Sequence, residues 1–160
     1  MGINLWGVIY GCHVVAPMFR AQGSGHFINI ASLAAIAQAP SMAPYNVTKG
    51  AVVALSETLA AELRPCGAGV TVVCPSFFET NLMKTSRSHG IDATGLAEKL
   101  MKRSRVQADD VARVAVDCAR RNELYALPHP EGKVLWALKR LAPSLYHGTI
   151  APRAARRMQR

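Results

Sequence analysis

Three side chains in the first third of the sequence have the chemistry needed for a proton transfer. Ser32 carries a hydroxyl, Tyr45 a phenol and Lys49 an ammonium group. A phenol exchanges its proton poorly at neutral pH, but a neighbouring ammonium stabilises the phenolate form. A hydroxyl can donate a hydrogen bond to an oxygen on which negative charge develops. The set therefore predicts general acid–base catalysis at a substrate oxygen, with Tyr45 as the acid–base group.

A strand and a helix are needed to bring these groups together. Residues 26–31 form a nearly continuous apolar run, which predicts a parallel strand buried on both faces, and Ser32 follows where it ends. Pro44 is typical of a first helical turn, so we expect a helix from 44 to about 64, with the phenol and the ammonium on one face. Ligands of parallel α/β sheets bind outside the carboxyl ends of the strands. The three groups should therefore meet in one crevice.

The pattern resembles the active-site half of the short-chain dehydrogenase/reductase family. The resemblance covers about residues 3 to 128, and several motifs in the right order are more specific than Tyr-x-x-x-Lys alone. These motifs are Asn4 in I-N-L-W-G, Ser32, Tyr45-x-x-x-Lys49, the helix A-V-V-A-L-S-E-T-L-A-A-E-L, the strand G-V-T-V-V and the segment C-P-S-F-F-E-T-N. The resemblance implies an α/β fold, the carboxyl-terminal half of a Rossmann-like doubly wound parallel sheet, followed by a helical tail.

The resemblance also implies an activity and a role for each site residue. The activity is interconversion of an alcohol and a carbonyl with NAD or NADP, in which Tyr45 protonates the carbonyl oxygen and Ser32 donates a hydrogen bond to it. Lys49 and Tyr45 would both contact the cofactor, with Lys49 bonding the ribose hydroxyls. Asn4 would hold a water in a proton relay.

A further segment would meet the nicotinamide carboxamide. Its residues are Pro75, Ser76, Phe77, Phe78 and Thr80. Ser76 stands where the family has glycine, and a positive φ at this position would cost a serine about 1 kcal/mol.

A long irregular segment is expected from residue 75 to about 96, where the family covers its substrate. Phe77, Leu82 and Met83 are predicted to contact the substrate together with Ser32, and their apolar character favours a lipophilic alcohol or carbonyl. The histidines lack metal-ligand spacing, so no metal is expected, and only His89 is retained as a substrate contact.

The glycine-rich phosphate loop of a dinucleotide fold is missing. That loop lies in the first βα turn, and the sequence contains neither T-G-x-x-x-G-x-G nor G-x-G-x-x-G. We therefore expect residues 1–128 to form only the second half of the domain, as a fragment, a truncated gene model or a late start, and to be inactive alone. The choice between NAD and NADP stays open.

Charge and hydropathy limit the kinds of partner that the protein can have. Residues 131–160 hold +6 of the net charge of +9, so the basic character belongs to an extension over 129–160 and indicates no nucleic-acid site. The apolar helices at 4–20 and 44–64 predict a homo-oligomer. Two alternatives to an enzyme remain: a non-catalytic oligomerisation module built on those helices, and a membrane-surface protein that binds through its basic tail.

The first nineteen residues contain no Asp, Glu, Lys or Arg, so a membrane span or signal peptide must be considered. The apolar residues recur at helical spacing, which favours a buried helix. The four cysteines form no C-x-x-C pair, which indicates reduced thiols and a cytoplasmic protein.

Overall fold

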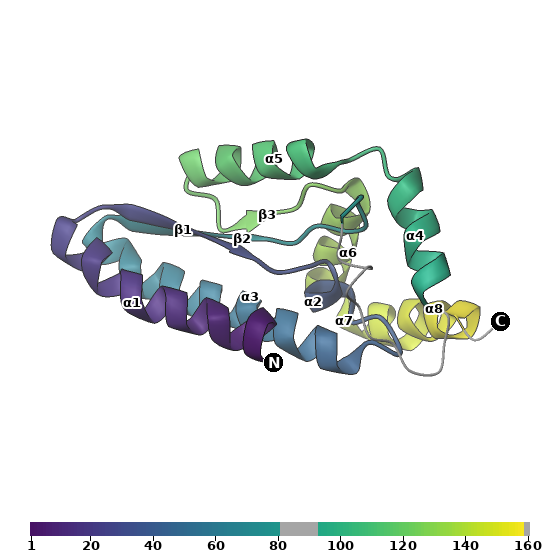
Figure 1. The fold of residues 1–160 in the computed structure, drawn as a ribbon. Helices are drawn as coiled ribbons and strands as arrows, with labels where there is room; N and C mark the ends of the chain where they lie inside the picture. The colour runs from purple at the N-terminus through teal and green to yellow at the C-terminus, as the bar shows by residue number, and fades with distance from the viewer. Residues whose placement is uncertain (81–92, 159–160) are drawn as a thin grey trace.

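The computed structural model describes residues 1–80 and 93–158, and Figure 1 shows its layers. In chain order, its helices and strands are η1 (Gly2–Trp6), α1 (Gly7–Gln22), β1 (Gly25–Ile30), α2 (Ala34–Ala37), α3 (Ala43–Leu63), η2 (Arg64–Cys66), β2 (Ala68–Val73), α4 (Ala93–Arg103), α5 (Ala108–Arg120), β3 (Tyr125–Ala126), α6 (Pro130–Leu141), α7 (Pro143–Leu145), η4 (Tyr146–Ile150) and α8 (Ala151–Met158). The α/β class predicted from the sequence is confirmed.

The three strands form one parallel sheet in the order β1-β2-β3, with Gly25 opposite Ala68 and Ile30 opposite Val73. Helices α1 and α3 cover one face of this sheet and α5 lies on the other (Figure 1). Because every strand points the same way, their carboxyl ends meet at one edge. The loops that follow Ile30, Val73 and Ala126 therefore lie at that edge.

The middle strand matches its sequence pattern best. All six residues of β2 are buried, as the apolar run around Val70–Val73 predicts. The two turns that bring the chain into β1 and β2 depend on glycine, since Gly23 and Gly67 both adopt positive φ. A Cβ on Gly67 would lie 2.5 Å from the carbonyl oxygen of Gly23, so the two turns also pack against each other.

The prediction that β1 is buried on both faces is wrong for this structure. Phe27 and Asn29 are buried under α1 and α3, but Ile28 is 40% and Ile30 50% exposed. Within the described residues β1 pairs with β2 alone, so its other edge is also free. The apolar residues on both faces are typical of a strand that is covered on both sides. Here α5 lies mainly over β2, so it leaves Ile28 and Ile30 of β1 partly exposed.

Helix α1 differs from the prediction in the same way. Its inner face packs into the core through Cys12 and Ala16, and Phe19 meets Phe27 with ring centroids 4.8 Å apart. The opposite face of α1 and of the preceding turn η1 is apolar and exposed, and its residues are Ile3, Trp6, Tyr10, Val14 and Met18. We call these residues the α1 stripe.

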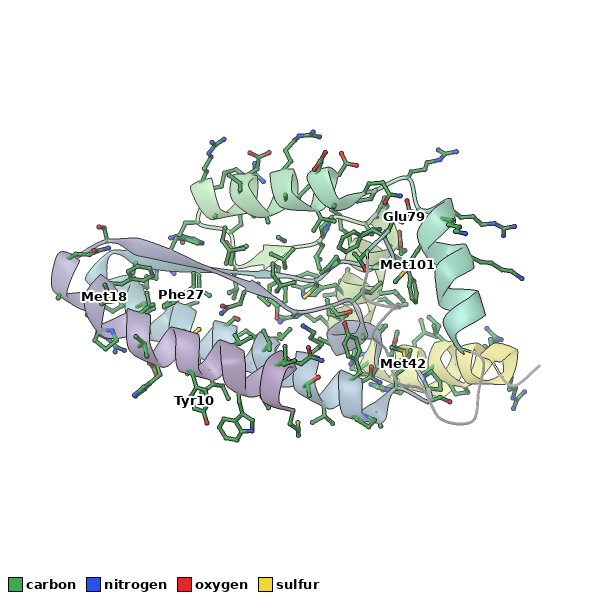
Figure 2. The ribbon with its side chains drawn as sticks, in the orientation of Figure 1. Tyr10, Met18, Phe27, Met42, Glu79 and Met101 are labelled. Atoms are coloured by element: carbon green, nitrogen blue, oxygen red, sulfur yellow. The ribbon has the colours of Figure 1, made fainter. Side chains whose placement is uncertain are left out.

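Figure 2 shows Tyr10 directed away from the sheet and Phe27 between the sheet and α1. The helical segment Gly2–Gln22 is long and apolar enough to cross a membrane, but core helices and signal sequences meet the same test.

The segment after β3 packs against the domain. Leu135 and Trp136 of α6 pack against the core that includes Val52 and Leu127, while Val134 and Leu141 face solvent. Arg140 of α6 forms an ion pair with Glu57 of α3, with 2.8 Å between nitrogen and oxygen, and lies over the Trp136 ring. Helix α6 therefore packs on the domain with one side and leaves apolar residues of the other side exposed.

Candidate active site

Helix α3 presents Tyr45 and Lys49 near the carboxyl end of β1. The Lys49 Nζ lies 6.0 Å from the centre of the Tyr45 ring and donates a hydrogen bond of 2.9 Å to the carbonyl oxygen of Ile30. Burial lowers the pKa of Lys49 from its ordinary value because the charged form loses hydration. The bond to the last residue of β1 fixes the ammonium at the strand end.

Ser32 lies two residues beyond β1 and reaches the same place. Its hydroxyl accepts a hydrogen bond of 3.2 Å from the backbone N–H of Ala34 at the start of α2. The backbone of Ser32 is hydrogen-bonded to the thiol of Cys74, and the Lys49 ammonium acts on the same thiol. Burial raises the pKa of Cys74 to about 12, so this thiol is neutral. Lys49 therefore lies near the Tyr45 ring and near the Cys74 thiol that the Ser32 backbone contacts.

Asn4 occupies η1, a π-helical turn that packs against α3. π-Helical turns are often found at functional sites. Its side chain is half-buried, and within the described residues no hydrogen bond joins it to Ser32, Tyr45 or Lys49. The structure thus places Asn4 on a turn that adjoins α3, with no hydrogen bond among the described residues to the other three.

The segment after β2 crosses the same edge of the sheet. The carbonyl oxygen of Pro75 accepts a hydrogen bond of 2.8 Å from the N–H of Leu33, which joins this segment to the serine loop. Ser76 is not among the residues with positive φ, which within the described chain and apart from glycine are Gln38, Ser41 and Asn122. The expected strain of a serine at the glycine position is therefore absent.

The other residues predicted to contact the cofactor or the substrate differ in their exposure and in whether the structure describes them. Phe77 is 38% exposed, whereas Phe78 packs against the core around Val73 and Val111. Thr80 is the last described residue of this segment. Leu82, Met83 and His89 lie outside the described residues.

Sequence reasoning missed His129, which is 3% exposed and directly precedes α6. Its ring hydrogen-bonds to the backbone of the segment after β2. One signal was available: His129 follows the third strand, so it lies at the same edge as Ser32 and Pro75, which follow the first and second.

Two residues of the tail were also missed. Lys139 donates a hydrogen bond of 2.8 Å to the carbonyl oxygen of Ile36, and Tyr146 donates one to that of Ala37. Both bonds hold the carboxyl end of α2, the short helix that follows Ser32. The tail therefore supports the serine loop, which the sequence pattern of the tail does not indicate.

This edge of the sheet combines a phenol, a hydroxyl and a half-buried ammonium with a loop whose backbone is fixed. An ammonium has three N–H donors, and among the described residues Ile30 accepts from one of them. Two remain for a ligand rich in hydroxyl groups, such as a ribose. The arrangement suits proton transfer to an oxygen held beside a diol-bearing ligand.

Comparison with known proteins identifies the class to which this fold and site belong. A family model described as enoyl-(acyl carrier protein) reductase matches residues 1–122. An oxidoreductase of Mycobacterium tuberculosis, EphD, is 29% identical over 158 residues, 93% of this chain and 27% of the relative. The 2-(R)-hydroxypropyl-CoM dehydrogenase of Xanthobacter autotrophicus is 36% identical over 80 residues, 50% of this chain and 32% of the relative.

Solved structures agree with the sequence relatives. A short-chain dehydrogenase/reductase from Burkholderia phymatum in complex with NAD superposes with a TM-score of 0.75 at 29% identity, over 90% of this chain and 57% of that one. One from Sphingobium yanoikuyae in complex with NADPH gives 0.68 at 27% identity, over 91% and 54%. The chain belongs to the short-chain dehydrogenase/reductase family. It spans about a quarter to a third of the curated relatives named above.

Proposed function

We propose that this chain is the catalytic part of an NAD(P)-dependent oxidoreductase that interconverts an alcohol and a carbonyl. The observation that carries the proposal is the position of Lys49. Its ammonium is fixed at the carboxyl end of β1, lies beside the Tyr45 ring and acts on the thiol that the Ser32 backbone also contacts. The NAD and NADPH bound by the related structures support a nicotinamide cofactor.

In the direction of carbonyl reduction, Tyr45 gives its proton to the carbonyl oxygen. Ser32 donates a hydrogen bond to the same oxygen, where negative charge develops. The Lys49 ammonium stabilises the phenolate that remains on Tyr45. A bound nicotinamide supplies the hydride in this direction and accepts it in the other.

The residues present fit such a cofactor. The free N–H groups of Lys49 would hold the ribose hydroxyls, and the backbone of residues 75–78, with Thr80, would face the carboxamide. Asn4, on the turn that packs against α3, would hold a water that exchanges protons with the site. Ser32, Phe77, Leu82 and Met83 would contact the substrate, and the apolar character of the last three favours a lipophilic one.

Tyr45→Phe tests the assignment in a polypeptide that also carries the glycine-rich first half of the fold. The variant keeps the ring and loses the proton donor, so turnover should fall by roughly 10² or more while the dissociation constant for the cofactor barely changes. Lys49→Ala should impair both turnover and cofactor binding, because the ammonium serves both. Near-normal turnover of Tyr45→Phe would show that Tyr45 is not the acid–base group.

We also propose that the protein forms a homo-oligomer in the cytoplasm. The α1 stripe is an exposed apolar face with the stacked rings of Trp6 and Tyr10 at its centre, and a second subunit would cover it. All four cysteines are free thiols, which suits a reducing compartment. Sedimentation of the whole protein tests the assembly. A non-catalytic module that only oligomerises is the second candidate function, since the same stripe favours it. Tyr45→Phe distinguishes the enzyme from the module, because a module has no turnover that the substitution could reduce.

A further inference from the structure

The ring of His129 bonds to two successive residues of the segment after β2. Nδ1 accepts a hydrogen bond from the backbone N–H of Ser76 at 3.1 Å, and Nε2 lies 3.2 Å from the carbonyl oxygen of Phe77. The ring is also near that of Phe78, with centroids 6.5 Å apart. A single buried side chain thus satisfies a backbone donor and a backbone acceptor in a stretch without regular secondary structure.

The three polar neighbours of the ring agree on one tautomer. Nδ1 faces an N–H donor, so it must be unprotonated. Nε2 faces the carbonyl oxygen of Phe77 and, at 3.5 Å, the hydroxyl oxygen of Ser104. That hydroxyl donates its own hydrogen to the carbonyl oxygen of Val106, so toward His129 it can only accept. Nε2 therefore carries the proton, and the ring is neutral.

This geometry fixes the loop more firmly than either bond would alone. A rigid ring that holds the N–H of Ser76 and the C=O of Phe77 sets the direction of both backbone groups at once. The two ends of the loop are fixed separately. The carbonyl oxygen of Pro75 accepts from the N–H of Leu33, and the N–H of Glu79 donates to the side chain of Gln107. Without His129, the loop between these two points would hold an unpaired N–H and an unpaired C=O.

We propose that His129 is a positioning residue that presets the cofactor-facing loop. This inference rests on the proposed function, in which the backbone at residues 75–78 faces the nicotinamide carboxamide. His129 itself contacts neither substrate nor cofactor. It acts by holding the loop in the binding conformation before the cofactor arrives, so that binding does not have to order the loop.

Two substitutions separate the bonds that His129 makes. His129→Asn places an oxygen where Nδ1 was and so keeps an acceptor for Ser76, but it leaves Phe77 without a donor. His129→Leu removes both bonds at similar volume. His13→Leu is the matched control, because His13 is exposed on α1 and far in sequence from the loop.

The first readout is hydrogen exchange of the Ser76 amide in the full chain without cofactor. We expect exchange at least roughly tenfold faster in His129→Leu, restoration towards the wild-type rate in His129→Asn, and no change in His13→Leu. A nitrogen-detected NMR spectrum of the unmodified protein should show His129 protonated on Nε2 alone. A proton on Nδ1, or an unchanged Ser76 rate in His129→Leu, overturns the positioning role whether or not the protein is a dehydrogenase.

The second readout is the Michaelis constant for the cofactor in the polypeptide with the complete fold. His129→Leu should raise it roughly tenfold with a much smaller effect on kcat, and His129→Asn should recover part of the loss. Faster Ser76 exchange with an unchanged Michaelis constant would mean that His129 orders the loop but the loop does not face the cofactor. That result contradicts the proposal while leaving the acid–base assignment of Tyr45 intact.

Discussion

Ser56→Ala should destabilise the protein far more than loss of one hydroxyl from a helix normally does. Ser56 is fully buried on α3, below the turns that carry Tyr45 and Lys49, and its Oγ accepts a hydrogen bond of 3.0 Å from Nδ2 of Asn29 on β1. The same hydroxyl donates to the carbonyl oxygen of Val52 at 2.7 Å. This contact therefore sets the register of α3 against the strand that leads to Ser32.

The magnitude follows from what each partner loses. The Val52 carbonyl keeps its helical N–H partner, so its loss is small. Asn29 is only 7% exposed, and its other amide atom accepts a weak bond from the Cys12 thiol at 3.7 Å. Its amide donor would be left buried and unpaired, which costs about 1–3 kcal/mol. In a protein of this size each kcal/mol lowers Tm by roughly 2–4 °C.

Thermal unfolding followed by circular dichroism measures the effect, with Thr58→Ala as the matched control. Thr58 makes the same type of bond, to the carbonyl oxygen of Ala54 at 3.0 Å, but its side chain is exposed. Thr58→Ala should change stability by less than about 0.5 kcal/mol. Replacing both buried partners, with Asn29→Leu and Ser56→Ala together, should cost less than the two single changes added. Equal Tm values for Ser56→Ala and Thr58→Ala would refute the reasoning.

Two further predictions concern charge. Burial lowers the pKa of Lys49 in the folded protein, so its ammonium costs stability below that lowered value, and the cost disappears as pH rises towards the unfolded value of 10.5. Lys49→Met should therefore abolish activity without lowering Tm at neutral pH. Any gain in Tm over the wild type should shrink as the pH rises towards 10.5, and a large loss of Tm would contradict this. The tail is docked on the domain through α6, so we expect no co-sedimentation of the protein with anionic vesicles at low salt, although Arg153 and Arg156 are exposed. Co-sedimentation at low salt that high salt abolishes would instead support a membrane anchor.

The sequence predicted local features well and long-range contacts poorly. The apolar run at β2 and the helix that carries Tyr45 were predictable because their cause is local periodicity. Helix α2 was missed because its four residues, Ala34–Ala37, form a single turn with no side-chain cap. The bonds from His129 to Ser76 and from Lys139 to Ile36 join residues 53 and 103 positions apart, and no local pattern records such a pairing.

The wrong prediction for β1 also arises because a local pattern does not record long-range contacts. An apolar strand pattern shows which surfaces need cover, and it does not show which segment provides it. Ile28 and Ile30 were predicted to be buried from their side chains alone, and the fold leaves them exposed because α1 and α3 occupy the opposite face. The strand ends were predicted more reliably, since parallel strands end at one edge by construction, whereas the roles assigned to Ser32, Tyr45 and Lys49 stay predictions.

The exposed edge of β1 yields the last prediction, that the 160-residue chain expressed alone is neither a stable monomer nor a working dehydrogenase. Within the described residues, one edge of β1 has no neighbouring strand. Beside that edge, α1 and β1 form an apolar groove of about 450 Å³ that includes Phe27 and Ile28. A long apolar edge of this kind pairs readily with other chains.

Light scattering of the purified chain should show dimers or larger species, and titration with NADH or NADPH should show weak binding. Ile28→Lys places a charge beside the free edge and should increase the monomer fraction. Val116→Lys is the control, since Val116 on α5 is 42% exposed and is not among the residues that line this groove. Equal effects of the two lysine substitutions would show that the free edge of β1 does not cause the association. A soluble monomer that binds either dinucleotide at micromolar concentration would contradict the prediction as a whole, because the chain would then contain a phosphate site that neither its sequence nor its described structure indicates.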